Sequence, residues 1–222
     1  MLHPLEEPLK MAFPLHRWLA EDREEAYSDW LVWILEQLGS ARHVGYVLWG
    51  EEMPGFSLSD QRCSVEREVW VPEGHPGRSG RLDCVIRIGE EAIILVEVKV
   101  VWAEWADLGK NRGYRQWLDS QPFPIRKAYL LATGGDRHLY EGDFELVTWG
   151  AICRRLRRLI PELAAEGRPT LAALTGGFVG AVEQNLLGLP SLVWLERGDE
   201  SLTALVRRSE VMAATNYFRQ LL

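Results

Sequence analysis

The sequence predicts an α/β fold in which helices flank a β-sheet, and three observations point to this class. Residues 80–100 read as two apolar strands joined by a tight turn at 89–91. The stretch before them, residues 21–38, places apolar side chains at the spacing of a helix. Strand-like segments at 127–133 and 144–147 lie farther along, between two helical stretches. Strands that alternate with helices along a chain are typical of α/β proteins.

The part of the chain before the hairpin contributes an irregular arm, a helix and a strand. Three prolines interrupt residues 1–17, so we expect an arm without regular structure there. The helix over 21–38 ends at Gly39, a residue that terminates helices readily. The glycine-bearing stretch that follows is irregular except for a short strand at 44–49. Residues 64–72 alternate polar and apolar side chains, as a half-buried strand does.

The part after the hairpin is mainly helical apart from its two strands. A polar, basic stretch leads into a helix that begins at or before Tyr114 and ends before Pro122. Thr148 is placed to cap the N-terminus of the next helix, and Pro161 opens the element after it. Three helices complete the expected fold, over residues 151–160, 171–187 and 201–222.

Composition and charge narrow the class of protein. The 222 residues fit one domain with a helical appendage, and 47% hydrophobic residues with ten tryptophans supply a substantial core. No stretch of about 18 uninterrupted apolar residues is present, so no membrane span is predicted. The proline-bearing N-terminus does not resemble a secretion signal, and three scattered cysteines without zinc spacing indicate reduced thiols in a cytoplasmic protein. The net charge of -7 argues against a large nucleic-acid-binding surface, although a local cluster of basic residues could still bind nucleic acid.

Three charged residues interrupt the apolar hairpin: Asp83 in its first strand, and Glu97 and Lys99 in its second. If Ile88 pairs with Ala92 around the turn, residues whose numbers sum to 180 lie opposite each other, and Asp83 faces Glu97. Opposed residues of an antiparallel pair share a face with Cβ atoms about 5 Å apart, and side chains two apart on a strand share that face too. The hairpin therefore predicts that two carboxylates and one ammonium converge, whereas a register slip of one residue would separate the acids.

The chemistry of this trio points to a divalent cation. The apolar residues around it, such as Val85 and Leu95, indicate a sheet buried on both faces. Burial of unpaired carboxylates is costly or forces protonation, and Mg²⁺ removes that cost while taking only one or two carboxylates from the protein. The alternative is an ordinary salt bridge between Lys99 and Asp83 or Glu97, which the hairpin alone does not exclude.

Asp83, thirteen intervening residues and then Glu97-Val98-Lys99 on two adjacent strands resemble the active-site hairpin of the PD-(D/E)xK nuclease superfamily. An acidic helix before the hairpin, a glutamine-bearing helix after it and a later strand ending in Thr148-Trp149 match the flanks of that family over roughly residues 20–160. The overall pattern is most similar to an uncharacterised bacterial branch. The resemblance implies a restriction-endonuclease-like mixed central sheet in αβββαβ order, flanked by helices, with a C-terminal helical extension.

The same resemblance implies a role for each residue of the site. The expected ligands of Mg²⁺ or Mn²⁺ are Glu24, Asp83, Glu97 and the backbone carbonyl of Val98. Glu25 is the alternative to Glu24, and the simpler explanation of both acids is that they favour the helix macrodipole. Lys99 would position the attacking water or help to deprotonate it, and Gln116 would support the site.

Some positions depart from the family pattern or leave alternatives open. Leu82 stands where the family has a proline, and Ser120 stands where it often has an aromatic residue, for which Tyr114 substitutes in part. Glu66 and Glu68 could approach the metal, although solvent exposure is the simpler expectation. Two basic groups could meet phosphate or form solvated helix faces; they are Lys110, Arg112 and Arg115, and Arg154, Arg155, Arg157 and Arg158.

These observations predict a metal-dependent nuclease that hydrolyses phosphodiester bonds through a metal-activated water, with DNA as the expected substrate. The alternative is a nuclease-like module that binds nucleic acid or a protein partner without cutting, in a defence, repair or restriction complex. The intact trio argues against that alternative, while the acidic charge and Ser120 favour it. A protein partner or a homodimer fits either function. We expect residues 1–160 to form the nuclease-like core with its arm, and residues 161–222 to form the helical extension packed on it.

Overall fold

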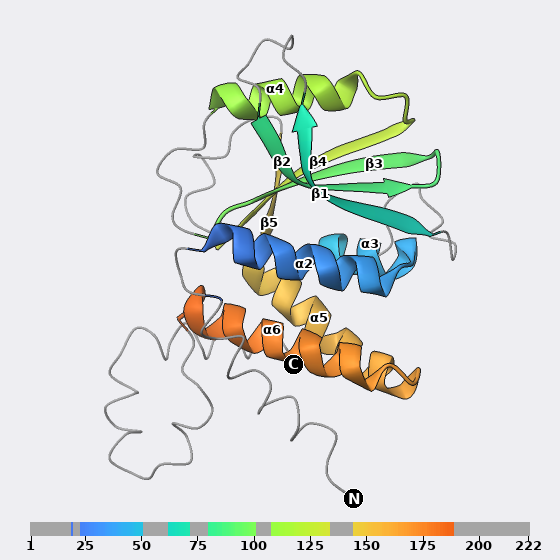
Figure 1. Cartoon of the computed structure of the whole chain (residues 1–222), viewed down its shortest axis with the longest axis vertical. Coiled ribbons are helices and arrows are strands. Elements are labelled where there is room, and N and C mark those ends of the chain that lie inside the picture. Colours follow the sequence, from blue (N-terminus) through green and yellow to red (C-terminus); the bar gives the residue numbers. More distant parts are fainter. Residues whose placement is uncertain are drawn as a thin grey trace, which may run out of the picture. The chain divides into compact units, whose positions relative to one another are not determined.

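The computed structural model describes residues 19, 23–50, 62–71, 80–100, 108–133 and 144–188, which form five helices and a five-stranded sheet (Figure 1). The arm over 1–17 and the helix over 201–222 that the sequence predicts lie outside these residues. The chain divides into two compact units. One is Glu21–Arg155, and the other combines Met1–Ala20 with Leu156–Leu222.

The sheet is mixed, as expected, and its strands follow one another in the order β1-β2-β3-β4-β5. The strands are β1 (Cys63–Val71), β2 (Gly80–Ile88), β3 (Ala92–Val98), β4 (Ile125–Ala132) and β5 (Glu145–Thr148). The first three form an antiparallel meander, and β4 and β5 add to it in parallel. The α/β class and the positions of these strands are therefore confirmed.

The register of β2 and β3 agrees with the prediction made from the length of the turn. Ile88 pairs with Ala92 and Cys84 pairs with Val96, so opposed residue numbers sum to 180. Gly89 adopts a φ of 51° in the turn, a left-handed conformation that glycine takes without a steric penalty. Every residue of β3 is buried, which is the pattern expected of a central strand covered on both faces.

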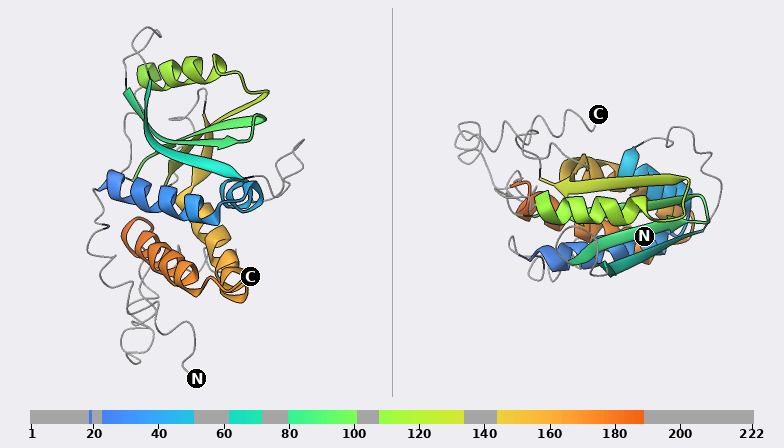
Figure 2. Two further views of the ribbon diagram at one scale, coloured as in Figure 1. Left: turned by 45° about the vertical axis from the view of Figure 1, so that its right-hand side comes forward. Right: turned by 90° about the horizontal axis from the view of Figure 1, so that it is seen from above.

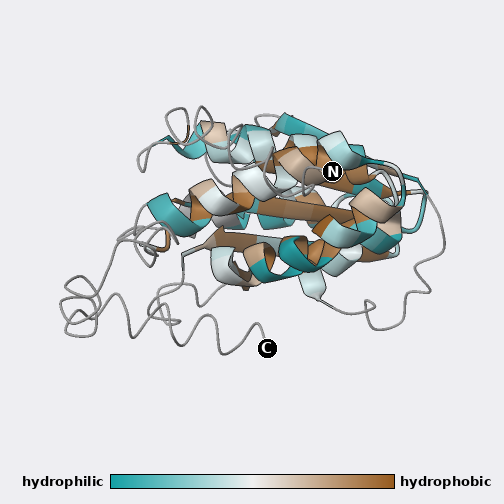
Figure 3. Ribbon diagram, turned by 90° about the horizontal axis from the view of Figure 1, so that it is seen from below, coloured by the Kyte–Doolittle hydropathy of each residue, from teal (hydrophilic) through white to brown (hydrophobic). Residues whose placement is uncertain are grey.

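Helices cover both faces of the sheet within the first unit. Helix α4 (Leu108–Asp119) lies on one face, while α2 (Glu24–Leu38) and α3 (Ala41–Trp49) lie on the other (Figures 1 and 2). The core under α4 includes Tyr114, Trp117, Leu118, Val85, Ile93, Leu95 and Leu130. On the opposite side the ring of Trp49 meets that of Tyr129 edge-on, with centroids 5.5 Å apart. Colouring by hydropathy accordingly shows the central strands as hydrophobic (Figure 3).

Helix α3 corrects the prediction of a short strand at 44–49. Six mostly apolar residues are too few to distinguish a buried strand from a helix by periodicity. Ser40, the residue before the helix, favours the helix over a strand. Its Oγ accepts a hydrogen bond from the backbone N–H of His43 at 3.2 Å and caps the N-terminus. At the other end Gly50 adopts a φ of 87°, and its N–H bonds to the carbonyl of Tyr46.

Helix α5 (Trp149–Ala165) corrects a second expectation, because it continues through Pro161 instead of ending before it. The proline removes one backbone hydrogen bond, but Leu159 and Leu163 beside it are buried and keep the helix packed. The cap predicted for this helix is confirmed, since the Oγ1 of Thr148 accepts a hydrogen bond from the N–H of Ala151 at 3.2 Å.

Arg155 and Arg157 of α5 bind groups on other helices. Arg155 donates to the carbonyls of Val47 and Leu48 at 3.0 and 2.6 Å, so it binds the C-terminal end of α3. In the second unit Arg157 pairs with Glu183 of α6 (Pro169–Asn185), with its Nε donating at 2.6 Å. Glu183 is only 6% exposed, whereas the side chain of Arg157 is 40% exposed, so a buried carboxylate pairs with a guanidinium that still reaches water. Neither arginine is therefore a merely solubilising residue.

None of the helices that the structure describes is long and apolar enough to cross a membrane.

Candidate active site

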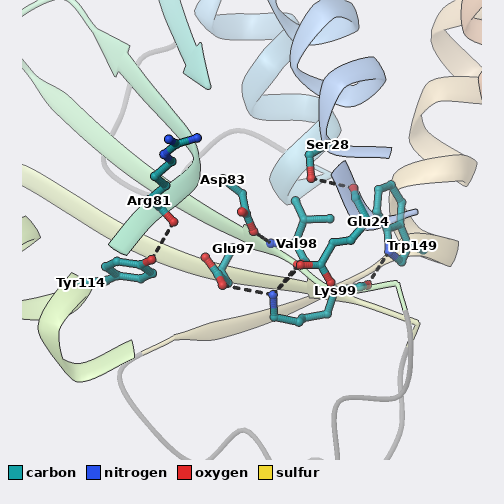
Figure 4. A network of polar contacts seen from close by, with 9 residues as sticks. All are labelled: Glu24, Ser28, Arg81, Asp83, Glu97, Val98, Lys99, Tyr114 and Trp149. Carbon is teal, nitrogen blue, oxygen red and sulfur yellow. Dashed lines mark hydrogen bonds and ion pairs between the residues drawn. The ribbon is translucent and has the colours of Figure 1, made fainter. Parts of the chain in front are cut away.

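Four of the predicted site residues converge beside the ends of β2 and β3. Figure 4 shows the side chains of Glu24, Asp83, Glu97 and Lys99 pointing toward one another. The Nζ of Lys99 lies 2.8 Å from Oε1 of Glu24 and 3.1 Å from Oε1 of Glu97. It also donates to the carbonyl of Val98 at 2.8 Å. The ammonium thus contacts three of the four groups that the sequence predicts as metal ligands.

Asp83 is held by the backbone of the neighbouring strand. The paired residues of β2 and β3 end with Cys84 and Val96. Beyond that point the Oδ2 of Asp83 accepts a hydrogen bond from the N–H of Val98 at 2.8 Å. This bond points the carboxylate toward β3, on the side where Glu97 lies (Figure 4).

Burial and neighbouring charges shift the pKa values of Asp83 and Lys99. Burial, followed by the negative charge of Glu97, raises the pKa of Asp83 from 3.8 to about 7, against the lowering effects of the Val98 N–H and of Lys99. Burial lowers the pKa of Lys99, but the charges of Glu97 and Glu24 outweigh it and the pKa is raised overall. Near neutral pH Lys99 is therefore charged while Asp83 exchanges a proton.

The backbone of Lys99 is fixed from two directions. Its N–H donates to the carbonyl of Leu131 at 2.7 Å, and its carbonyl accepts a hydrogen bond from Nε1 of Trp149 at 2.9 Å. Trp149 is fully buried, and its ring meets that of Tyr27 edge-on, with centroids 5.9 Å apart. Tyr27 belongs to the helix that carries Glu24, so Trp149 joins the two elements that supply Lys99 and its partner.

The sequence does not predict this role of Trp149. There the residue contributes only to the resemblance, as part of the strand end Thr148-Trp149. The hydrogen bond links residues separated by 50 positions, and only the parallel addition of β4 and β5 brings them together. The sequence shows only that a tryptophan, whose indole N–H is a hydrogen-bond donor, directly follows a strand. This does not identify the acceptor.

Tyr114 supports the strand that carries Asp83. It is fully buried, and its hydroxyl donates to the carbonyl of Arg81 at 2.6 Å, two residues before Asp83. Ser120 is exposed, and its Oγ donates to the carbonyl of Trp117 at 2.6 Å. The partial substitution of Tyr114 for an aromatic residue at the position of Ser120 stays a prediction.

Gln116 is half-buried on α4, and its Oε1 is buried without a hydrogen-bond partner among the described residues. No hydrogen bond within this part of the chain joins it to the acids or to Lys99. Its supporting role therefore remains a prediction that rests on the resemblance.

The remaining charged candidates that the structure describes are exposed or form ion pairs on the surface. Glu25 is exposed, whereas the neighbouring Glu24 contacts Lys99. Arg112 is exposed, and Arg115 pairs with Asp119 at 3.2 Å along the same helix. The side chain of Lys110 lies outside the described residues. Glu66 and Glu68 form surface ion pairs, with Arg87 and with Arg67 and Arg81 respectively.

Asp83, Glu97 and the Val98 carbonyl offer the donors that Mg²⁺ prefers. They are hard oxygens, and they include the one or two carboxylates that this ion usually takes from a protein, with water and substrate completing its coordination. The raised pKa of Asp83 shows the cost of placing a carboxylate here, which a cation would offset. Among the described residues, no group of three or more His, Cys, Asp and Glu side chains is arranged to hold a metal ion by itself. Two carboxylates with a carbonyl fit a partly hydrated Mg²⁺ but not a closed structural site.

Comparisons with protein-family models, with curated proteins and with solved structures return no match to this chain.

Proposed function

We propose that this protein is a metal-dependent nuclease of the PD-(D/E)xK type, which hydrolyses phosphodiester bonds in DNA. The observation that carries the proposal is the convergence of Glu24, Asp83 and Glu97 around Lys99 at the ends of two adjacent strands. The element order supports it as well. An antiparallel meander, a crossing helix and strands added in parallel follow the αβββαβ order that the family resemblance implies, so the proposal includes a restriction-endonuclease-like core.

In the proposed mechanism Asp83, Glu97 and the Val98 carbonyl would hold Mg²⁺ or Mn²⁺. The bound metal would supply an acidified water and stabilise the charge that develops on the phosphate. Lys99 is protonated at neutral pH because its pKa is raised, so it orients the attacking water or the phosphate and does not act as a base.

Glu24 acts on Lys99 in this scheme. Its side chain is 35% exposed and contacts the ammonium at 2.8 Å, so it holds Lys99 when Glu97 turns to the metal. Trp149 and Leu131 keep the backbone of Lys99 in place, and only its side chain needs to move.

Cleavage of plasmid and single-stranded DNA by the full chain tests the proposal, with Mg²⁺, Mn²⁺ or EDTA present. We expect Asp83→Ala and Lys99→Ala each to lower the rate by about a hundredfold or more, the usual effect of removing a group that stabilises transition-state charge. Glu24→Ala should lower the rate as well, while Glu25→Ala is the matched control because Glu25 is exposed on the same helical turn. Wild-type activity that survives both the Asp83 and the Lys99 change would refute the assignment.

One observation favours a second function, a nuclease-like module that binds nucleic acid or a protein partner without cutting. The ammonium of Lys99 already neutralises part of the acidic cluster, which is how an ordinary salt-bridged sheet would be built. Calorimetric titration with Mn²⁺ distinguishes the two functions. The nuclease binds Mn²⁺ in a manner that Asp83→Ala abolishes, whereas the module shows no divalent binding that depends on Asp83.

A further inference from the structure

Trp70 is an exposed aromatic residue on the edge of the sheet. It is 56% exposed, and it is the only large hydrophobic residue that the described part of the chain leaves so open. It lies on β1, the first strand in the sheet order, and its partner across the ladder is Arg81 of β2. Opposed residues of an antiparallel pair share a face with Cβ atoms about 5 Å apart. The indole of Trp70 and the guanidinium of Arg81 are therefore neighbours on the same side of the sheet.

Arg81 connects this surface to the candidate active site. Its side chain is 62% exposed, and it stands two residues before Asp83 on β2. Its carbonyl is held by the hydroxyl of the buried Tyr114 at 2.6 Å. Two residues of a strand span about 7 Å, so the backbone of Arg81 lies close to that of Asp83. A strand bound at Arg81 thus reaches the acids within a short distance.

Glu68 orients the guanidinium of Arg81. It lies between Arg67, which pairs with Cys84, and Val69, which pairs with Leu82, so it falls opposite Asp83 where the ladder is interrupted. Its φ of 53° is rare for a residue other than glycine, and such conformations cluster at functional sites. In this conformation its Oε2 accepts a hydrogen bond from Nη1 of Arg81 at 3.1 Å. A guanidinium has five N–H donors, so one bond to Glu68 fixes its direction while others can meet a phosphate.

We propose that Trp70 and Arg81 form a binding subsite for single-stranded nucleic acid, an inference that rests on the proposed function. An unpaired base stacks on the indole, and Arg81 binds the adjacent phosphate and directs the strand toward Asp83. Bases in a duplex are already stacked on each other and cannot take this position, so single strands are preferred. A subsite based on stacking also suits a chain of net charge -7, which lacks the excess of basic residues that duplex binding uses.

Fluorescence anisotropy with a short labelled single strand tests the inference, in EDTA so that no cleavage is needed. We expect Trp70→Ala to weaken binding by about 10- to 100-fold, the effect of losing one stacked base, and Trp70→Phe to retain most of the affinity. Arg81→Ala should weaken binding and reduce the slope of log K against log salt by about one phosphate contact. Arg42→Ala, at an exposed arginine of α3, is the control for loss of charge alone.

The outcomes separate this inference from the proposed nuclease activity. Binding of DNA or RNA single strands that depends on Trp70 supports the subsite. If the wild type binds such strands but cleaves neither, only the proposed nuclease activity is contradicted. Trp70→Ala protein that melts like the wild type and binds single strands equally well overturns the subsite, as does a wild-type preference for duplex.

Discussion

The stability of the protein should fall as the pH rises through the titration of Asp83. Burial and the charge of Glu97 raise the pKa of this carboxyl from 3.8 to about 7 in the folded state. Between these two values the folded protein holds a proton that the unfolded chain has released, so the free energy of unfolding decreases as the pH increases. A shift of about three units at about 1.4 kcal/mol each gives a maximum loss of about 4 kcal/mol, complete above about pH 7.

Asp83→Asn isolates this effect. Asparagine has the same size and keeps a carbonyl oxygen that accepts the N–H of Val98, a bond of 2.8 Å in the structure, but it cannot ionise. We expect the variant to exceed the wild type in unfolding free energy by about 2 to 4 kcal/mol at about pH 8, and to match it near pH 4 where both side chains are neutral. Urea denaturation in EDTA across this range measures the difference.

Asp119→Asn is the matched control, because Asp119 is an exposed aspartate on α4 and surface changes usually alter stability by no more than about 0.5 kcal/mol. Added Mg²⁺ should stabilise the wild type but not Asp83→Asn, since a ligand stabilises only the folded state that binds it. A variant less stable than the wild type at about pH 8, or a difference that does not change with pH, would refute the reasoning.

Two further predictions concern buried polar contacts. Trp149→Phe keeps most of the ring but removes the donor to the carbonyl of Lys99, so we expect a loss of about 1 to 3 kcal/mol in urea denaturation together with slower Mg²⁺-dependent cleavage; unchanged stability would mean that the bond contributes nothing. Arg157→Ala removes the cation from Glu183, which is 6% exposed, and should cost about 1 to 3 kcal/mol, because the guanidinium is itself 40% exposed and water can partly replace it. Arg158, which is exposed like Arg157, is changed to Ala as the control, and replacing both Arg157 and Glu183 by Met should recover most of the loss if the buried carboxylate causes it.

The part of the site that could be predicted from the sequence is the part that a short turn determines. Three turn residues fix the pairing of Ile88 with Ala92, and the alternation of side chains then carries Asp83 to the position opposite Glu97 without any tertiary information. Glu24 could be placed on the inward face of its helix by the spacing of the apolar residues that follow it. These inferences need only local geometry, which follows from the turn length and the spacing of the residues.

The remaining features depend on contacts between distant segments. The bonds from Trp149 to Lys99 and from Tyr114 to Arg81 join residues 50 and 33 positions apart, so neither follows from a local pattern. The apolar run of helix α3 is so short that its pattern fits a strand as well as a helix. Ser40, a residue type typical of helix N-caps, is the local signal that favours the helix. Pro161 indicates a helix boundary by itself, and the packing of its neighbours, which keeps the helix intact, is a tertiary effect.

The charges of the cluster suggest how it would accept a metal ion. Glu24, Asp83 and Glu97 are three carboxylates against the single ammonium of Lys99, so the cluster stays negative even while Asp83 carries a proton. Asp83 and Glu97 would hold the cation, so Asp83 would give up its proton and Lys99 would keep Glu24 as its partner. Because Trp149 fixes the backbone of Lys99 while its long side chain can rotate, the exchange needs no movement of the sheet. Metal binding and the placement of the lysine against the phosphate would then be one event, so a proton should be released when Mn²⁺ binds near neutral pH.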